Sequence, residues 1–133
     1  MKIQHVTLDW VHHTWPAVEP FIASALEHST DYTLDQVKTL VATGQWYLIV
    51  AAEGAEIRGA ATVNVFNRPD NRVAFITTIG GRLISSDDTF AQLKALMTMF
   101  GATEVEGAAR ESIARLWHRY GFEEKYRIVG VKL

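Results

Sequence analysis

The chain of 133 residues has no cysteine, only three prolines and no apolar run of membrane-spanning length. Without cysteine it can form no disulfide, no thiolate metal site and no cysteine nucleophile. A transmembrane helix needs roughly 20 consecutive apolar residues, and residues 1–5 lack the charged and then apolar pattern of a secretion signal. We therefore expect a soluble, cytoplasmic protein that does not enter a membrane.

An excess of charge of one sign is also missing. Lysine and arginine number 13 and aspartate and glutamate 15, so the formal net charge is -2. Broad nucleic-acid binding needs a basic surface that neutralises phosphates. The five histidines are not spaced like metal ligands, and the adjacent His12 and His13 point in different directions on any regular element. The sequence predicts neither broad nucleic-acid binding nor a metal site.

The chain does contain enough apolar material for one core. Its 48% apolar and 21% charged residues are typical of a globular domain. A domain of this length buries roughly two-thirds of the surface of its unfolded chain. Since no repeat, linker or low-complexity tract divides the sequence, we expect a single domain over residues 1–133.

Hydrophobic periodicity and turn residues divide the chain into strands and helices. We expect strands at 2–8, 46–52, 57–66, 72–79 and 103–106, with a last strand or a broken pair in the β-rich tail 122–133. We expect helices at 15–26, 34–43, 87–100 and 109–120. The order βααβββαβαβ(β) predicts an α/β fold with helices on both faces of a mixed, mostly antiparallel sheet.

The pattern also predicts where the large apolar side chains lie. Trp46, in an apolar strand, is expected in the core, whereas Trp10 and Trp15 are expected to form a surface pair. Four residues of the last helix recur at steps of three and four and are expected to face inward: Ile113, Leu116, Trp117 and Tyr120.

The last helix ends in the sequence Leu-Trp-His-Arg-Tyr-Gly-Phe, residues 116–122. This ending looks like the Leu-Tyr-x-x-x-Gly-Phe motif of the GNAT superfamily of N-acetyltransferases, and the element order of nearly the whole chain resembles that of the family. The resemblance implies a GNAT-like fold whose sheet opens between the fourth and fifth strands. In the family, acetyl-CoA lies in that opening.

If acetyl-CoA binds, the resemblance assigns six residues to it. The strand that ends at Ile79 would present backbone groups to the pantetheine arm, and the N-terminus of the following helix would face the diphosphate. The residues implied are Thr77, Thr78 and Ile79 for the pantetheine, and Arg82, Ser85 and Ser86 for the diphosphate.

The loop before that helix departs from the family's pattern Gln/Arg-x-x-Gly-x-Gly/Ala, whose glycines let backbone N–H groups approach the phosphates. Here Gly80 and Gly81 come too early, and Asp87 and Asp88 place negative charge at the helix start. Such carboxylates stabilise a helix by about 0.3–1 kcal/mol each, but they repel an anionic cofactor. Either Arg82 contacts a phosphate, or the glycines only turn the chain and Arg82 stays solvated.

Catalytic residues are predicted only for an active enzyme. In the family, a tyrosine four residues before the glycine of Gly-Phe protonates the CoA thiolate. Trp117 stands there, and an indole N–H is no proton source near neutral pH. Tyr120 has a phenol that can donate a proton, but it stands at a different position along the helix. Glu104 and Glu106 share one face of the short strand and could relay the amine proton, although solvated strand-edge carboxylates are the commoner case.

Two functions follow from the residues and the resemblance. The first is a GNAT-like protein that has lost or weakened acetyl transfer, needs no cofactor, and acts as a binding or structural component through a protein partner or self-association. Short GNAT-like phage proteins have a similar ending, so the resemblance implies either the cytoplasm or a phage particle. The alternative is an active acetyl-CoA-dependent N-acetyltransferase for an unidentified amine.

Overall fold

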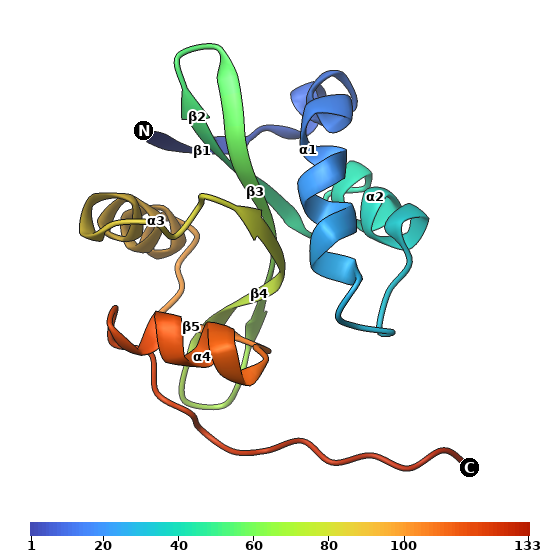
Figure 1. Cartoon of the computed structure of the whole chain (residues 1–133), viewed down its shortest axis with the longest axis vertical. Helices are drawn as coiled ribbons and strands as arrows, with labels where there is room; N and C mark the ends of the chain where they lie inside the picture. Colours follow the sequence, from blue (N-terminus) through green and yellow to red (C-terminus); the bar gives the residue numbers. More distant parts are fainter.

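The computed structural model describes all 133 residues and contains one five-stranded sheet with helices on both faces (Figure 1). This arrangement confirms the predicted fold class. No helix has the length and apolar character needed to cross a membrane. In their order across the sheet, the strands are β1 (Lys2–Val6), β2 (Tyr47–Glu53), β3 (Glu56–Asn67), β4 (Arg72–Gly81) and β5 (Glu104–Gly107).

The helices form two layers. α1 and α2 cover one face of the sheet, and α3 and α4 cover the other (Figure 1). A short 3-10 turn, η1, joins β1 to α1. The bounds are η1 (Leu8–Trp10), α1 (Val11–Leu26), α2 (Leu34–Ala42), α3 (Asp87–Met99) and α4 (Glu111–His118).

Two apolar clusters, one on each face, hold the layers to the sheet. Leu48 and Val50 of β2 belong to the cluster under α1 and α2, whereas Ile49 and Ala51 belong to the cluster under α3 and α4. Successive side chains of a strand point to opposite faces. β2 is apolar from Leu48 to Ala52 and is therefore buried on both sides of the sheet.

Local residue patterns set the starts of α2 and α3 and the turn between β2 and β3. Thr33 and Gln36 form a capping box at the start of α2, and Ser86 and Thr89 form one at the start of α3. Gly54, with φ of 61°, turns β2 into β3, a conformation that costs glycine little. These features confirm the predicted starts of the helices at 34 and 87.

β4 is the strand on which the sheet opens. It pairs with β3 along its whole length, but in parallel with β5 only from Val73 to Ile76. The last part of β4, residues 77–81, therefore has no strand on the β5 side. Thr77 is also the extra residue of a β-bulge, because Thr62 pairs with Thr78 and the next residue of β3 pairs with Ile76.

The predicted last strand at 122–133 is wrong. No residue after β5 is in a strand, and the chain beyond α4 runs extended to its C-terminus (Figure 1). The residue types there do favour strands, but a strand forms only where another strand pairs with it. In this structure the backbone of the tail pairs with no other strand.

The expected start of α1 and one aromatic position are also wrong. The helix begins at Val11, four residues before the expected start, so that Pro16 and Pro20 lie inside it. Trp15 is only 2% exposed, because it shares the inner face of α1 with Val18 and its neighbours a turn away. Trp10 is 56% exposed, as predicted.

In the last helix the prediction holds for three of four residues. Trp117 is buried, and Ile113 and Tyr120 pack against the same cluster. Leu116 is 42% exposed, which contradicts its expected inward position. α4 ends at His118 and is only eight residues long, so it rests on the sheet along a narrow stripe that does not reach Leu116.

Candidate functional site

The opening between β4 and β5 brings the six predicted cofactor residues onto one path. Thr77, Thr78 and Ile79 form the unpaired end of β4. Arg82, Ser85 and Ser86 follow on the loop that leads into α3. The order of these residues therefore agrees with a path for the pantetheine and the diphosphate. Their hydrogen bonds show which hydroxyl and N–H groups along this path are free.

The threonines of β4 are already bonded to β3. Thr62 Oγ1 lies 2.6 Å from Thr78 Oγ1 and 2.7 Å from Thr77 Oγ1, and the Thr77 hydroxyl donates to the Thr62 carbonyl oxygen at 3.0 Å. Thr62 is buried and carries no signal in the sequence that would single it out. These hydroxyls fix the bulge and bond to one another before any ligand arrives.

The N-terminus of α3 is occupied by its own side chains. The N–H groups of Ser85 and Ser86 both donate to Thr89 Oγ1, at 3.2 and 3.1 Å, and the Thr89 N–H donates to Ser86 Oγ at 3.1 Å. Thr89 was not singled out in the sequence, although its spacing from Ser86 is that of a capping box. Three N–H groups at the start of α3 therefore already have hydrogen-bond acceptors.

Between Leu83 and Thr89, the N–H groups of Leu83, Ile84, Asp87 and Asp88 have no hydrogen-bond partner, and the carboxylates of Asp87 and Asp88 are exposed at the start of α3. Arg82 is exposed and forms no ion pair, so its guanidinium is the one cation of the loop. A helix N-terminus attracts an anion through unpaired N–H groups and its partial positive charge. Here three of the N–H groups from Leu83 to Thr89 are bonded and four are free, and two carboxylates offset the partial positive charge of the helix start.

Aromatic side chains fill the space between α3 and α4. Phe90 of α3 contacts Tyr120 and Phe122, with ring centroids 5.5 and 5.4 Å apart. Trp117 contacts Phe122 at 5.0 Å and lies against β5, since a Cβ on Gly107 would be 3.0 Å from the indole. Tyr120, the predicted proton donor, is thus one member of an apolar cluster.

The predicted carboxylates lie on β5 and face away from that cluster. Arg68 donates to both oxygens of Glu106, with 2.9 Å between Nη2 and Oε1, and Lys125 Nζ lies 2.8 Å from Glu106 Oε2. The Arg68 hydrogen bonds, with those from Lys125, lower the pKa of Glu106 to about 2. A carboxylate with so low a pKa accepts a proton poorly at neutral pH.

Glu104 lies in the same network. Asn71 Nδ2 donates to Glu104 Oε2 at 2.7 Å, and Lys125 Nζ bonds Glu104 Oε1 at 3.1 Å. Arg68 and Asn71 come from the turn between β3 and β4, and Lys125 comes from the tail. Sequence reasoning missed all three, because no local pattern links them to β5. These contacts favour a structural role, and the catalytic assignment of the two carboxylates stays a prediction.

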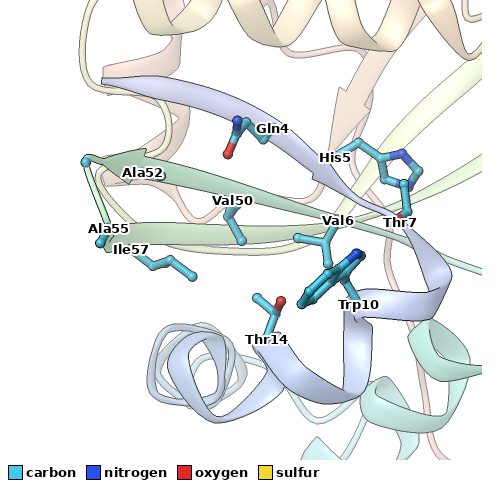
Figure 2. Close-up of a pocket in the computed structure, with 11 residues that line it drawn as sticks. Gln4, His5, Val6, Thr7, Trp10, Thr14, Val50, Ala52, Ala55 and Ile57 are labelled. Carbon is cyan, nitrogen blue, oxygen red and sulfur yellow. The ribbon is translucent and has the colours of Figure 1, made fainter.

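A separate hollow of about 560 Å³ lies between β1, the β2–β3 hairpin and α1. Figure 2 shows Gln4 and Val6 of β1 pointing toward α1, with Trp10 and Thr14 on the opposite wall, while His5 turns away. Trp10 meets His13 edge to face, at 5.2 Å between ring centroids. The hollow thus combines an exposed aromatic wall with uncharged polar groups, away from the β4–β5 opening.

Three solved structures show what the fold is similar to. A probable acetyltransferase is 15% identical, with 100% of this chain and 97% of that chain covered and a TM-score of 0.69. The aminoglycoside N-acetyltransferase AAC(6')-Iy, in complex with CoA, is 13% identical, covering 99% and 93%, with a TM-score of 0.70. A ribosomal-protein-alanine N-acetyltransferase from Brucella melitensis biovar Abortus 2308 is 11% identical, with full coverage of both chains and a TM-score of 0.69.

These similarities extend over the entire domain, from β1 to the tail. Family models and curated protein sequences gave no match. At identities this low the shared property is the architecture, and fold alone does not fix function. The chain has the GNAT fold, as the resemblance of its last helix and its element order implied.

Proposed function

We propose that this GNAT-fold chain has lost or weakened acetyl transfer and acts as a binding or structural component. The observation that carries the proposal is the capping box of α3, in which Ser85, Ser86 and Thr89 bond to one another. A diphosphate would have to break these bonds and approach Asp87 and Asp88. The Ser86 and Thr89 hydroxyls thus compete with a diphosphate for the same N–H groups, and the two carboxylates repel it, so the cap opposes cofactor binding.

The catalytic groups support the same proposal. An acetyl transfer to an amine needs a group that takes up the amine proton, and a general base works best when its pKa lies near the operating pH. Glu106 has a pKa of about 2 and is bonded to Arg68 and Lys125. The position of the family's phenol holds Trp117, which is buried against Gly107.

The binding role needs a surface, and the hollow beside β1 supplies one. Its aromatic wall at Trp10 and its polar groups at Gln4 and Thr14 suit an uncharged partner surface or small molecule. We propose that a protein partner, or a second copy of the chain, is bound through exposed apolar surface of this kind. Assembly into a phage particle, which the resemblance implied, stays a prediction.

The alternative is an active acetyl-CoA-dependent N-acetyltransferase that acts on an amine. Two features favour it: β4 keeps a bulge at Thr77 beside the opening of the sheet, and Arg82 is unpaired next to it. The similar structures named as N-acetyltransferases support the same alternative. In this case Thr77, Thr78 and Ile79 would hold the pantetheine, and Arg82, Ser85 and Ser86 the diphosphate.

Titration calorimetry with acetyl-CoA separates the two proposals. We expect no saturable heat from the full-length chain, because three donors at the start of α3 are occupied and the local charge is negative. Saturable binding in the micromolar range that Arg82→Ala abolishes would contradict the main proposal and support the alternative. Arg119→Ala, which removes an exposed arginine outside the loop, is the matched control.

A further inference from the structure

The hollow beside β1 is lined by uncharged side chains. None of the 11 residues that line it is an aspartate, glutamate, lysine or arginine. His5, the one titratable residue among them, turns away from α1 (Figure 2) and meets the rings of Tyr47 and Phe100, at 5.2 and 5.1 Å between ring centroids. An ion that enters such a site loses water and gains no opposite charge in return. The lining therefore favours a neutral ligand.

Three polar groups on the walls of the hollow are free to bond a ligand. The Gln4 amide lies on the β1 side, and the Thr14 hydroxyl and the Trp10 indole N–H lie on the side of α1 and η1 (Figure 2). None of the three takes part in a hydrogen bond within the chain, whereas the Thr7 hydroxyl donates to Asp9 at 2.6 Å. An amide and a hydroxyl each donate and accept. A matching ligand therefore carries donors and acceptors on more than one side.

The rest of the lining is apolar. Val50 of β2 and Ile57 of β3 form part of the sheet wall, and Trp10, 56% exposed, forms the facing aromatic wall. The face of an indole ring is negative and attracts the weakly positive C–H groups of a ligand. The volume of about 560 Å³ is within the range of roughly 300–1,000 Å³ that is usual for small-molecule sites. The hollow therefore suits a ring with apolar C–H faces and a polar rim.

We propose that this hollow binds a neutral sugar in its pyranose form. The hydroxyl groups around a pyranose ring both donate and accept, so they match the Gln4 amide and the Thr14 hydroxyl on the two sides. The C–H groups of one ring face match Trp10. The facing sheet wall consists of branched aliphatic side chains, against which a puckered sugar ring packs better than a flat aromatic ring.

This inference rests on the binding role proposed above, and of the two occupants named there for the hollow it takes the small molecule. No residue that lines the hollow belongs to β4, to α3 or to the loop between them. Binding of a sugar and binding of acetyl-CoA are therefore separate measurements. Failure of the sugar titration leaves the argument about α3 intact, and saturable acetyl-CoA binding leaves the hollow unchanged.

A nuclear magnetic resonance titration of the ¹⁵N-labelled full-length chain tests the proposal. The probes are the methyl glycosides of glucose, galactose, mannose and N-acetylglucosamine. For at least one of them we expect a dissociation constant on the order of 1 mM. The Trp10 indole N–H and the amides of residues 4–7 and 54–57 should then shift saturably. No shift with any of the four sugars, or shifts confined to residues 77–86, would overturn the proposal.

Two further probes test the chemistry of the ligand. The methyl glycoside of glucuronate keeps the ring but adds a negative charge, and we expect it to bind at least about tenfold more weakly than the glucoside, because the lining offers no cation. Adenine is flat and neutral, and it should bind more weakly than the best sugar. Equal binding of the glucuronate probe and the glucoside, or tighter binding of adenine than of every sugar, would contradict the assignment.

Two substitutions and a matched control locate the site. Trp10→Ala removes the aromatic wall and should weaken sugar binding at least about tenfold. Thr14→Val keeps the shape but removes the hydroxyl, and should weaken it about three- to tenfold. Leu8→Ala, in the same turn and 55% exposed but outside the lining, should leave the affinity unchanged.

The three variants together keep the proposal falsifiable. Native affinity in both Trp10→Ala and Thr14→Val would overturn it, as would an equal loss in Leu8→Ala. If Trp10→Ala does not fold, Thr14→Val decides the outcome by itself.

Discussion

The two edge strands of the sheet, β1 and β5, differ in whether their outward backbone groups have hydrogen-bond partners. At β1, Gln92 of α3 reaches the edge and bonds to the Ile3 N–H and to the Met1 carbonyl oxygen. At β5, the outward backbone groups have no partner, and the tail that could supply one points away. An unpaired edge invites association with another chain. The comparison indicates that β1 is closed to pairing and that β5 is available for it.

The difference extends to the side chains behind each edge. β1 is held by α3 through a neutral amide, whereas β5 is held by Trp117 on one face and by an ion-paired network on the other. That network makes the carboxylates of β5 structural anchors of the tail. Lys125 of the tail is bonded to both carboxylates, and their catalytic role stays a prediction.

The largest effect is expected when the support of β5 is removed. Trp117→Ala leaves a cavity between α4 and Gly107, and such truncations of buried aromatic residues cost about 3–5 kcal/mol. Urea unfolding followed by circular dichroism should show this loss in the free energy of unfolding. Leu116→Ala, on the same helix but 42% exposed, should change it far less. Equal losses in both variants would mean that α4 packs on a different face.

A smaller effect is expected when the network of β5 is broken. Glu106→Gln removes the charge that Arg68 and Lys125 share, and hydrogen bonds to charged groups contribute about 1.5–3 kcal/mol. Because folding lowers the pKa of Glu106 from 4.5 to about 2, its contribution is complete above pH 4.5. It is lost as the pH falls from 4.5 toward 2, where the carboxylate becomes protonated in the folded state.

Unfolding measured over that pH range checks the sign. The stability difference between the native chain and Glu106→Gln should shrink steadily as the pH falls below 4.5. Glu124→Gln, which removes an exposed carboxylate paired only with Arg127, is the control and should give a small, flat difference. A difference that grows toward low pH would contradict the assigned pKa direction.

The smallest effect is expected at the closed edge. Gln92→Ala frees the Ile3 N–H and the Met1 carbonyl oxygen, and a typical hydrogen bond contributes about 0.5–1.5 kcal/mol. Amide exchange at Ile3 should become faster, while Met99→Ala, an exposed substitution on the same helix, should leave it unchanged. If Gln92→Ala also promotes self-association of the chain, then the amide is what keeps β1 from pairing.

How far the sequence could predict the structure differs between elements. The starts of α2 and α3, the β2–β3 hairpin and the burial of β2 on both faces follow from residues within a few positions of each other. The start of α1 and the burial of Trp15 could not be predicted in this way, because a preceding 3-10 turn lets the helix begin before Pro16. The candidate site was predicted as a set of residues, but not the bonds among them.

Those bonds join parts of the chain that are far apart. Glu106 meets Arg68, which is 38 positions away, and Lys125, which is 19 positions away. The tail also shows that local residue types do not suffice to predict structure. Its residues favour a strand, yet strand propensity acts only when a second strand is in place.

The order of strands and helices, the face on which most side chains lie and the acidic start of α3 could all be predicted from local patterns of residues. Periodicity and capping act between near neighbours, which is why one sequence suffices to read them. Local patterns could not predict which edge of the sheet is open, which N–H groups are free and which carboxylates are paired. These properties depend on contacts between residues distant in the chain, and only the folded arrangement brings such residues together.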